Sequence, residues 1–517
     1  MRVRQIRLRW LSPALAALAL APPTLGRTDQ RPQRAASVEA EISASPLDPE
    51  APPSPDPPPL DVRSFGARCD GVHSDAPAIN SAIREAARTG NLRVYIPPGT
   101  CHVKQEPGQG RLDIPIRPEV DGLTLSGAPG GASRILLDAD SLAILVSKGD
   151  TSPPQEVKNL TIRDLTFEVM RGKGMSHAGV LQLNHATRLH VADVVIKADG
   201  LAHQERDILM NGLVTSQGTT GLLERVVVDG GSKTGIYLAG GTHHLTVERC
   251  ETANLRCAPG GSAPAVGLSI ADAHAIRVID HHSHDNDGDG LVVCANGHPP
   301  IRLPGLPDDA YGSYYPLPQA HGPTTTLEVS GGLFVDNGKA SGSGIKVASA
   351  FAEVPRDIRI TGAVVHGNKA YGVLVEAGDS IDLEDAIISD NGLHGVLVRD
   401  IVLAGQAPDL SRTSRVQVID PSIYDNGRGV SSDVGGIEVW GRARDVTLRG
   451  GTIEKRDTSC RQNVGLGLVK DGKRSCIQLL VRDTSIASTP MPYGSRSSDG
   501  LFASVTVPPG LLFDCAP

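Results

Sequence analysis

The sequence predicts an all-β chain folded as a solenoid, in which short parallel strands stack coil upon coil. Five Asn residues each follow an Asp or a Gly, and each is followed within ten residues by a Gly that opens an apolar-x-apolar run. Another apolar-x-apolar run begins ten residues before each Asn, and glycines such as Gly372 and Gly395 are 23 residues apart. Repeats of this length, made of period-2 strands and tight turns, are typical of a solenoid. The repeat residues are Asn286, Asn337, Asn368, Asn391 and Asn426, followed by Gly290, Gly344, Gly372, Gly395 and Gly436.

The composition suits such a fold. Aromatic residues make up only 3% of the 517 residues, while Gly reaches 58, which favours a narrow core of Val, Ile and Leu with many turns. One solenoid can absorb this length. The formal net charge is -8, with no basic block after the first residues, so nucleic acid is an unsuitable partner.

The N-terminus has the pattern of an export signal. Four Arg residues precede an apolar run over 11–21 that is too short to span a bilayer. We expect a signal peptide over 1–26, a Pro-rich disordered linker over 27–60, no membrane span, and secretion to the periplasm or the exterior. The solenoid then covers 61–517, with a cap segment over 61–105 and a C-terminal cap or tail over 481–517.

The first folded segment predicts one short helix. Asp75 suits an N-cap, and Pro77 falls in the first turn, where its missing N–H costs little. Ile79, Ile83 and Ala87 recur at helical spacing, so the helix is amphipathic. A helix in this place can cover the open end of a solenoid.

The ranges Asp61–Gly71, Ser74–Ile83 and Val94–Cys101 resemble the opening segment of the pectate-lyase-like superfamily. That superfamily includes pectate lyases, polygalacturonases, rhamnogalacturonases and uronan epimerases. The resemblance implies a single-stranded right-handed parallel β-helix, capped by the N-terminal helix. It leaves the reaction open. Related sequences commonly have Gly and Tyr where this one has Cys69 and Cys101, so we expect a disulfide that pins the cap.

The remaining cysteines were paired by proximity in the sequence. Eight cysteines, an even number, fit an oxidising compartment. Closeness along the chain suggests the pairs Cys250–Cys257 and Cys460–Cys476, which leaves Cys294 with Cys515.

Counting from the repeat glycines assigns an outward face. Residues two and four positions after each Gly should point out of the coil. Charged and aromatic residues gather there in the last coils, and we take Lys346, Glu376, Arg399 and Glu438 as catalytic candidates. The alternative is a surface ladder of ion pairs, worth at most about 1 kcal/mol.

Two carboxylates two coils apart, roughly 9.6 Å at the backbone, approach the spacing of about 6.5–9.5 Å in inverting glycosidases. Glu376 and Glu438 therefore favour glycoside hydrolysis, with Arg399 gripping a uronate carboxylate. In a lyase or an epimerase, Arg399 or Lys346 would instead help remove the proton next to the carboxylate.

Aromatic residues near this face suit stacking on sugar rings. Two long insertions, after Gly290 and Gly395, leave the same turn of the coil, and loops on a rigid scaffold commonly build sites. The candidate substrate-binding residues are Trp440, Tyr237, Tyr311, Tyr314 and Tyr315.

The run from His281 to Gly290 is the densest polar cluster. His282 and His284 alternate like a metal pair on a strand, but the repeat alignment places His282 in a column of mainly apolar residues, so we expect it to face inward. Asp285, Asp287 and Asp289 match the start of a calcium loop without its closing Glu. We therefore expect no cofactor, with calcium at these aspartates as the alternative.

We expect the recurring Asn residues to have a structural role in the coils rather than a role in binding or catalysis. Stacked amides at a bend can bond along the ladder and tolerate a left-handed backbone.

The sequence thus predicts a secreted, monomeric, carbohydrate-active β-helix that acts on an acidic, uronate-containing polysaccharide, with hydrolysis favoured. A lyase or an epimerase of the same fold is one alternative. A non-catalytic, sugar-binding or adhesive surface protein is the alternative from another class.

Overall fold

The structure is a computed structural model. It describes residues 57–104, 115–138, 142–146, 156–171, 179–198, 211–257, 265–295, 322–339, 342–349, 353–400, 413–470, 479–497 and 503–504. The predictions of a signal peptide and of most of the linker concern residues 1–56, which lie outside this set. Across the described residues, no helix has the length and apolar character needed to cross a membrane.

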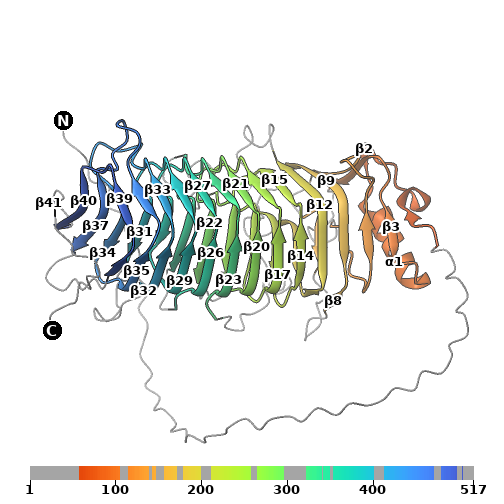
Figure 1. Cartoon of the computed structure of the whole chain (residues 1–517). Coiled ribbons are helices and arrows are strands. Elements are labelled where there is room, and N and C mark those ends of the chain that lie inside the picture. Colours follow the sequence, from red (N-terminus) through yellow and green to blue (C-terminus); the bar gives the residue numbers. More distant parts are fainter. Residues whose placement is uncertain are drawn as a thin grey trace, which may run out of the picture. The chain divides into compact units, whose positions relative to one another are not determined.

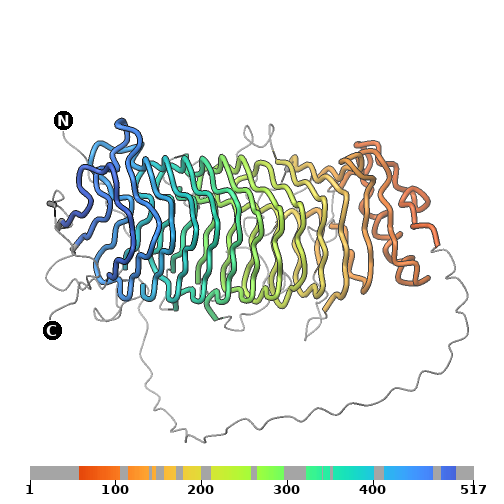
Figure 2. Tube along the Cα trace, viewed as in Figure 1, coloured from red at the N-terminus to blue at the C-terminus, as the bar shows by residue number. Residues whose placement is uncertain are grey.

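The described coils form a right-handed parallel β-helix, as predicted (Figure 1). Each regular coil contributes one strand to each of three parallel ladders, and Figure 2 shows the successive turns of the chain lying side by side. Register pairs such as Val292 with Lys346, and then Lys346 with Leu374, link consecutive coils without a shift. The repeat alignment therefore predicted the register correctly.

The first ladder consists of β14 (Gly221–Glu224), β17 (His243–Glu248), β20 (His274–Ile279), β23 (Thr325–Ser330), β26 (Arg356–Thr361), β29 (Gly378–Glu384), β32 (Thr413–Ile419), β35 (Arg444–Arg449) and β38 (Leu479–Arg482). The second ladder consists of β15 (Val227–Gly230), β18 (Glu251–Ala253), β21 (His282–His284), β24 (Leu333–Val335), β27 (Val364–His366), β30 (Ile387–Ser389), β33 (Ser422–Tyr424), β36 (Thr452–Glu454) and β39 (Ser485–Ala487).

The third ladder consists of β7 (Ile144–Val146), β10 (Gly179–Asn184), β13 (Asn211–Ser216), β16 (Ile236–Leu238), β19 (Leu268–Ala271), β22 (Leu291–Ala295), β25 (Ile345–Ser349), β28 (Val373–Val375), β31 (Val396–Arg399), β34 (Gly435–Trp440), β37 (Val464–Lys470), β40 (Met491–Ser497) and β41 (Ala503–Ser504). Among the described strands of this ladder, β41 alone pairs antiparallel, against β40.

The N-terminal coils are less regular. Strands β9 and β12 each run through both the first and the second ladder, because β12 pairs with β14 and with β15. The N-terminal elements are β1 (Leu60–Asp61), the 3-10 helix η1 (Val62–Phe65), β2 (Asp70–Ser74), α1 (Ala76–Thr89), β3 (Arg93–Tyr95), β4 (Gly99–Lys104), β5 (Thr124–Ser126), β6 (Ser133–Asp138), β8 (Val157–Lys158), β9 (Thr161–Arg171), β11 (Ala186–Thr187) and β12 (Leu189–Ala198).

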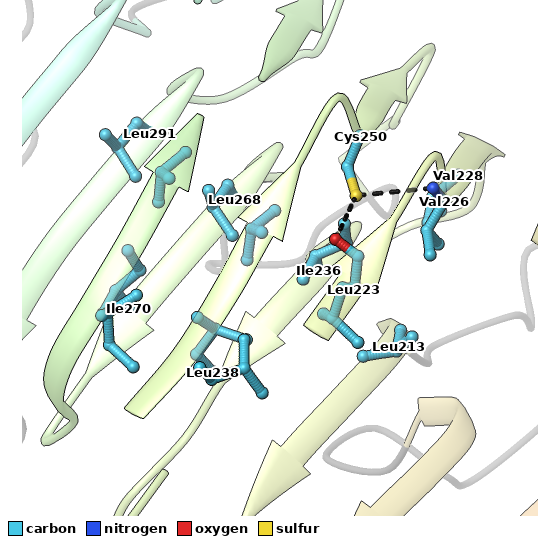
Figure 3. Packing of buried hydrophobic residues seen from close by; sticks show 14 of the residues in the cluster. Leu213, Leu223, Val226, Val228, Ile236, Leu238, Cys250, Leu268, Ile270 and Leu291 are labelled. Atoms are coloured by element: carbon cyan, nitrogen blue, oxygen red, sulfur yellow. Dashed lines mark hydrogen bonds between the residues drawn. The ribbon is translucent and has the colours of Figure 1, made fainter. Parts of the chain in front are cut away.

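Inward residues stack in columns through the core. Leu213, Ile236, Leu268 and Leu291 are register partners on four successive strands of the third ladder, and all are fully buried (Figure 3). Burying such side chains contributes roughly 1.5–3 kcal/mol each relative to exposure. Because one column joins many coils, the apolar core holds the stack together along its whole length.

The predicted asparagine ladder is present at the bend that leads into the third ladder. All five Asn side chains are buried, and each Nδ2 from Asn286 to Asn391 donates to the Oδ1 of the Asn in the next coil, at 2.9–3.1 Å. Gln462 continues the ladder, since its Oε1 accepts from Asn426 Nδ2 at 2.8 Å.

The left-handed backbone at this bend lies one residue earlier than we expected. Asp285, Asp336, Asp390 and Asp425 have φ of 53–56°, and Gly367 has φ of 69°. Asp and Gly tolerate this conformation better than most residues. The repeated Asp-Asn and Gly-Asn steps therefore combine a turn residue with an amide that bonds along the stack.

The predicted cap helix forms as α1, and Asp75 holds its N-cap position, where the Asp75 carbonyl oxygen accepts from the Ile79 N–H. The Asp75 side chain makes no capping bond and is instead buried, where Oδ1 accepts from the Arg68 N–H at 2.7 Å and Oδ2 accepts from the His102 N–H at 2.8 Å. This carboxylate thus joins the segment before the helix to β4. The predicted disulfide Cys69–Cys101 is present beside it.

Removing this disulfide is expected to destabilise the cap. The bond closes a loop with a sequence separation of 32, and disulfides of this kind typically stabilise proteins by about 2–4 kcal/mol. We expect the Cys69→Ser/Cys101→Ser double variant to lose about that amount in urea unfolding. The Cys257→Ser variant, which replaces an exposed free thiol, serves as the control. Equal unfolding midpoints for the two proteins would contradict the prediction.

The predicted disulfides Cys250–Cys257 and Cys460–Cys476 are wrong, because each described cysteine of these pairs is a free thiol. Cys250 and Cys460 are buried free thiols, and Cys257 is exposed and free. Cys250 points into the core, where its Sγ contacts the Val226 N–H and the Leu223 carbonyl oxygen (Figure 3). Burial raises the pKa of this thiol to about 12. Closeness along the chain failed because Cys250 occupies a core position that Cys257 cannot reach. Cys476 and Cys515 lie outside the described residues.

The expectation that His282 faces inward is also wrong. Its predicted column is correct in register, since His282 pairs with Leu333 and Leu333 with Val364. The column faces outward, however, because Leu333 is 42% exposed, whereas the neighbouring column, which contains Ser283 and Phe334, is fully buried. The preceding residue, His281, occupies the bend and is fully buried. The bend shifts the inside-outside phase by one residue, which a count along a straight strand cannot detect.

Candidate functional site

The candidate site lies on the outward side of the third ladder, over β25, β28, β31 and β34. In each of these strands the predicted inward residues are buried, as shown by Ile345 and Val347 on either side of Lys346. Lys346, Leu374, Leu397 and Glu438 form one outward column by direct register. The inside-outside assignment based on the glycines therefore holds for this ladder.

Three of the four catalytic candidates meet in one cluster. Glu376 follows the end of β28, and one carboxylate oxygen lies 3.1 Å from Lys346 Nζ, while the other accepts a hydrogen bond from Arg399 Nη2. The carboxylate is buried, with 8% of its side chain exposed, whereas Lys346 and Arg399 retain 30% and 28%. Two partly exposed cations therefore stand in front of one buried anion.

Glu438 forms a second cluster with residues of its own and the preceding coil. Its side chain is fully buried, and Oε2 accepts from Trp440 Nε1 at 2.5 Å. Its Oε1 lies 3.1 Å from His394 Nδ1, and the Gly435 N–H lies 3.1 Å from that nitrogen and 3.3 Å from Oε1. The Gly435 N–H thus lies within hydrogen-bonding distance of both members of the pair.

Sequence reasoning missed His394 and Tyr371. Both immediately precede a repeat glycine and lie on successive coils, as the Gly372 N–H bond to the His394 carbonyl oxygen shows. Their rings stack with centroids 5.7 Å apart and an interplanar angle of 8°. The signal was available, because the residue before each repeat Gly forms a third column on this side of the coils.

Much of this face is enclosed. Leu374, Leu397 and Glu438 point out of the coil, yet each is at most 3% exposed. Lys346, Arg399 and Trp440 remain partly exposed, so a ligand approaching the described face would meet these side chains first. The two carboxylates lie behind them.

Glu376 and Glu438 lie two coils apart, as predicted. Arg399 is the register partner of Trp440, and Val375 is the partner of Val398, so Glu376, Arg399 and Trp440 follow one another in a single column. The structure thus brings the four catalytic candidates onto one face, with Glu376 bonded to both cations and Glu438 in the adjoining cluster. Whether they perform catalysis stays a prediction.

Of the predicted aromatic residues, Trp440 lies in the site. Tyr237 on β16 is partly exposed in the same outward column as Lys346, with Ser269 and Val292 on the strands between them. Three inter-strand steps correspond to roughly 14 Å. Tyr311, Tyr314 and Tyr315 lie outside the described residues.

The three aspartates of the alternative calcium loop engage three different partners. Asp285 contacts His284 Nδ1 at 2.7 Å, Asp287 accepts from the Cys257 N–H at 3.0 Å, and Asp289 accepts from the Ser343 N–H at 2.6 Å. They are absent from the groups of described residues whose ligand atoms converge. The repeat turn sets their directions, because each takes a different position around the bend.

Asp289 lies in the column that precedes the glycines, close to Lys346. Burial raises the pKa of its carboxyl group, and the Ser343 N–H and Lys346 oppose this effect only in part. A carboxyl whose pKa is higher in the folded than in the unfolded chain binds more protons when folded. Its contribution to stability is therefore largest at acid pH and is lost as pH rises through the folded-state pKa.

We expect the Asp289→Asn variant to lack the decrease in folding stability that ionisation of the buried Asp289 carboxyl causes as pH rises. The variant should gain stability relative to the parent as pH rises from about 4 to 7, across the range above the unfolded pKa. Urea unfolding across this pH range measures the difference, with Asp357→Asn, an exposed residue of β26 with a left-handed backbone, as the control. Parallel stability curves for the parent and Asp289→Asn would contradict the prediction.

A surface groove lies elsewhere, over β17, β20, β23 and β26 of the first ladder. It is lined by Arg277, Glu328, Arg359 and Asp382, among others, and these pair across strands as Arg277–Glu328 and Arg359–Asp382. Arg277, Glu328 and Arg359 are 51–60% exposed and Asp382 is 22% exposed, and ion pairs at the surface contribute little to stability. The groove carries no buried reactive group, so we locate the candidate site on the third ladder.

Comparison with known proteins agrees with the fold. Residues 60–262, less than half of the chain, match the family described as rhamnogalacturonase A/epimerase, pectate lyase-like. The match and the architecture confirm the pectate-lyase-like superfamily of right-handed parallel β-helices, which the opening motif predicted.

Among curated proteins, mannuronan C5-epimerase AlgE4 of Azotobacter vinelandii is 35% identical over 109 residues, which is 21% of this chain and 19% of that protein. AlgE6 of the same organism is 37% identical over 110 residues, 21% of this chain and 12% of that protein. The matches thus span a fifth or less of these relatives.

Two solved structures share the fold. The A-module of AlgE6 superimposes with a TM-score of 0.51 at 18% identity, covering 85% of this chain and 100% of the module. The catalytic unit of a GH87 α-1,3-glucanase from Streptomyces thermodiastaticus superimposes with a TM-score of 0.50 at 16% identity, covering 88% of this chain and 71% of that one. At these identities the likeness concerns the fold alone.

Proposed function

We propose that this protein is a polysaccharide-modifying enzyme that acts on a uronate-containing chain by removing the proton next to the carboxylate, as an epimerase or a lyase does. The observation that carries the proposal is the pair of partly exposed cations, Lys346 and Arg399, that share the buried Glu376 beside the His394–Glu438 pair. The local identity to mannuronan C5-epimerases supports the choice of reaction class.

The cations account for substrate binding. An Arg guanidinium binds a carboxylate through two parallel hydrogen bonds, and a nearby ammonium adds a point charge. Neutralising the uronate carboxylate favours loss of the adjacent proton, because the charge that develops on the carboxylate in the transition state is stabilised. Glu376 holds both cations in place, since its two oxygens are bonded one to each.

The second cluster accounts for proton transfer. His394 Nδ1 and Glu438 Oε1 lie 3.1 Å apart, within the distance needed for a proton to pass between an imidazole and a carboxylate. Tyr371 is partly exposed and stacks on His394, so its hydroxyl is the acid or base of this cluster that a substrate would meet first. A lyase expels the neighbouring glycosidic oxygen after proton removal, whereas an epimerase returns a proton to the opposite face.

Hydrolysis remains the second candidate. Glu376 and Glu438 are two coils apart, close to the spacing of an inverting acid/base pair. We rank it lower because Glu376 is neutralised by two cations and Glu438 is fully buried against three N–H or ring nitrogen groups. With 8% of the Glu376 side chain exposed and none of Glu438, both carboxylates have little contact with the surface.

Incubation with polymannuronate, polygalacturonate and α-1,3-glucan separates these functions. We expect a change in the sugar configuration by NMR or new absorbance near 235 nm with one of the two uronans. New reducing ends without that absorbance would establish hydrolysis and overturn the ranking. Binding to a uronan without any product would indicate a non-catalytic surface protein.

We also propose that the protein is exported. The basic and apolar segments at the start of the chain and the Cys69–Cys101 disulfide both support an oxidising destination. Mass spectrometry of the protein recovered from the medium or periplasm should find a new N-terminus near residue 27. An intact Met1 in the mature protein would contradict export by this route.

A further inference from the structure

A group of metal-ligating side chains lies on the outward side of the second ladder, on a different sheet from the candidate site. Glu251 on β18 and His282 on β21 are register partners in adjacent coils, and His284 follows two positions along β21. All three point outward and are partly exposed. One ligand atom from each lies within 4.8 Å of those from the other two.

We propose that Glu251, His282 and His284 form a binding site for a divalent transition metal of the zinc class. Two imidazoles and one carboxylate are a common donor set for Zn²⁺, with the fourth position open to water or a ligand. These donors also suit Fe²⁺, Co²⁺ and Ni²⁺, but they are poorly matched to Ca²⁺ and Mg²⁺, which take mainly oxygen ligands. The site is therefore distinct from the predicted calcium loop.

The geometry needs only small side-chain movements. Ligands about 2.0–2.2 Å from a tetrahedral metal lie roughly 3.3–3.5 Å from one another. One edge is close to this length, because His284 Nε2 and Glu251 Oε1 are 3.2 Å apart. The rings of His282 and His284 stack with centroids 4.2 Å apart, so rotation of exposed side chains can bring the third donor to the same point.

Asp285 supplies the supporting interaction that such sites commonly have. Its Oδ2 lies 2.7 Å from His284 Nδ1, so it accepts the proton on that nitrogen and directs Nε2 toward Glu251. A carboxylate on the far nitrogen of a ligating imidazole fixes its tautomer and increases its basicity. The left-handed backbone of Asp285, with φ of 53°, turns this side chain back toward His284.

The alternative explanation is a histidine that merely bridges two carboxylates. That explanation accounts for the bonds of His284 to Glu251 and Asp285. It does not explain why the His282 ring stacks on the His284 ring. Two acidic side chains facing two imidazoles give a local negative charge that attracts a dication. Among the described residues, the one other group of converging ligand atoms is Cys69, Asp75 and Cys101, where the cysteines are joined by the disulfide.

The neighbouring coils show that this placement is local. In the next coil, Leu333 and Val335 occupy the positions of His282 and His284, and in the preceding coil Val227 occupies the position of Glu251. The metal would therefore join two adjacent coils through one residue of β18 and two of β21. A bound ion of this kind stabilises the folded state by mass action.

Zinc binding by the full chain, freed of metal and of any affinity tag, tests the proposal. We expect one Zn²⁺ per chain by equilibrium dialysis with elemental analysis, a Zn²⁺-dependent rise in the unfolding temperature, and visible absorption bands with Co²⁺. His282→Ala and the milder Glu251→Gln should each weaken Zn²⁺ binding at least tenfold. His366→Ala is the matched control, because His366 lies two coils along the column of His284 and bonds to Ser389.

Absence of Zn²⁺ binding by the parent protein would overturn the proposal, as would unchanged Zn²⁺ affinity in both site variants. Preference for Ca²⁺ over Zn²⁺ would equally contradict an imidazole site. Far-UV circular dichroism of each variant separates loss of the site from loss of the fold. The readouts require no turnover, so they stand independently of the proposed function.

Discussion

Replacing Asn391 by alanine is expected to lower the free energy of unfolding by about 2–6 kcal/mol. The Oδ1 of Asn391 accepts from both the backbone N–H and the Nδ2 of Asn368, at 3.0 Å each, in a fully buried ladder. Alanine leaves the Asn368 backbone N–H and one N–H of its side-chain amide without an acceptor, while the other amide N–H keeps its bond to the Phe334 carbonyl oxygen. Each buried unsatisfied N–H costs about 1–3 kcal/mol. Urea unfolding followed by circular dichroism measures the loss.

Asn463→Ala is the matched control. Asn463 lies outside the ladder, and its side chain bonds to Lys455 and Asp433, whose charged ends can turn to water. We expect it to cost less than 1 kcal/mol, as roughly holds for surface substitutions. If the two variants unfold at the same urea concentration, the ladder does not stabilise the stack in the way described.

Glu438→Gln is expected to lower turnover on the active polysaccharide by about 10²–10⁴-fold, the usual contribution of a positioned acid or base. Glutamine keeps the shape of the side chain but cannot exchange a proton with His394. Binding of the polysaccharide should remain within a few-fold of the parent value, because Lys346 and Arg399 bond to Glu376 rather than to Glu438. Initial rates over a range of substrate concentrations separate turnover from binding.

A stability measurement must accompany this variant. Glutamine has one acceptor oxygen, whereas the Trp440 and Gly435 N–H groups approach both oxygens of Glu438, so we expect a loss of about 1–3 kcal/mol. Glu454→Gln, on the second ladder and paired with Arg456, is the control for a changed charge at a distance from the site. Unchanged turnover in folded Glu438→Gln protein would remove this residue from the mechanism.

The repeat pattern was sufficient to predict the coils, their register and the outward columns of the third ladder. It succeeded because each repeat Gly and Asn is fixed by local backbone geometry and by contact with the same residue of the next coil. The same count of residues from the glycines places Lys346, Glu376, Arg399 and Glu438 on one face, where the structure has them.

The errors share a physical cause. His282 was placed inside because a bend at the buried His281 shifts the phase between two strands. Asp75 does stand at the N-cap of α1, but its side chain bonds to the Arg68 and His102 N–H groups instead of capping the helix, and His102 is distant in sequence. The burial of Glu438 and the isolation of Cys250 likewise depend on packing between segments far apart along the chain. Patterns within one segment carry no information about such contacts.

The antiparallel strand β41 has a consequence for association between molecules at the C-terminal edge of the third ladder. A parallel ladder leaves a row of unpaired backbone groups on its last strand, and such an edge can add a strand from another molecule. On the third ladder, β41 pairs antiparallel with Gly494 and Ser495 of β40 and occupies part of that edge. The pairing of β41 with β40 therefore leaves fewer backbone groups of this edge available to a strand from another molecule.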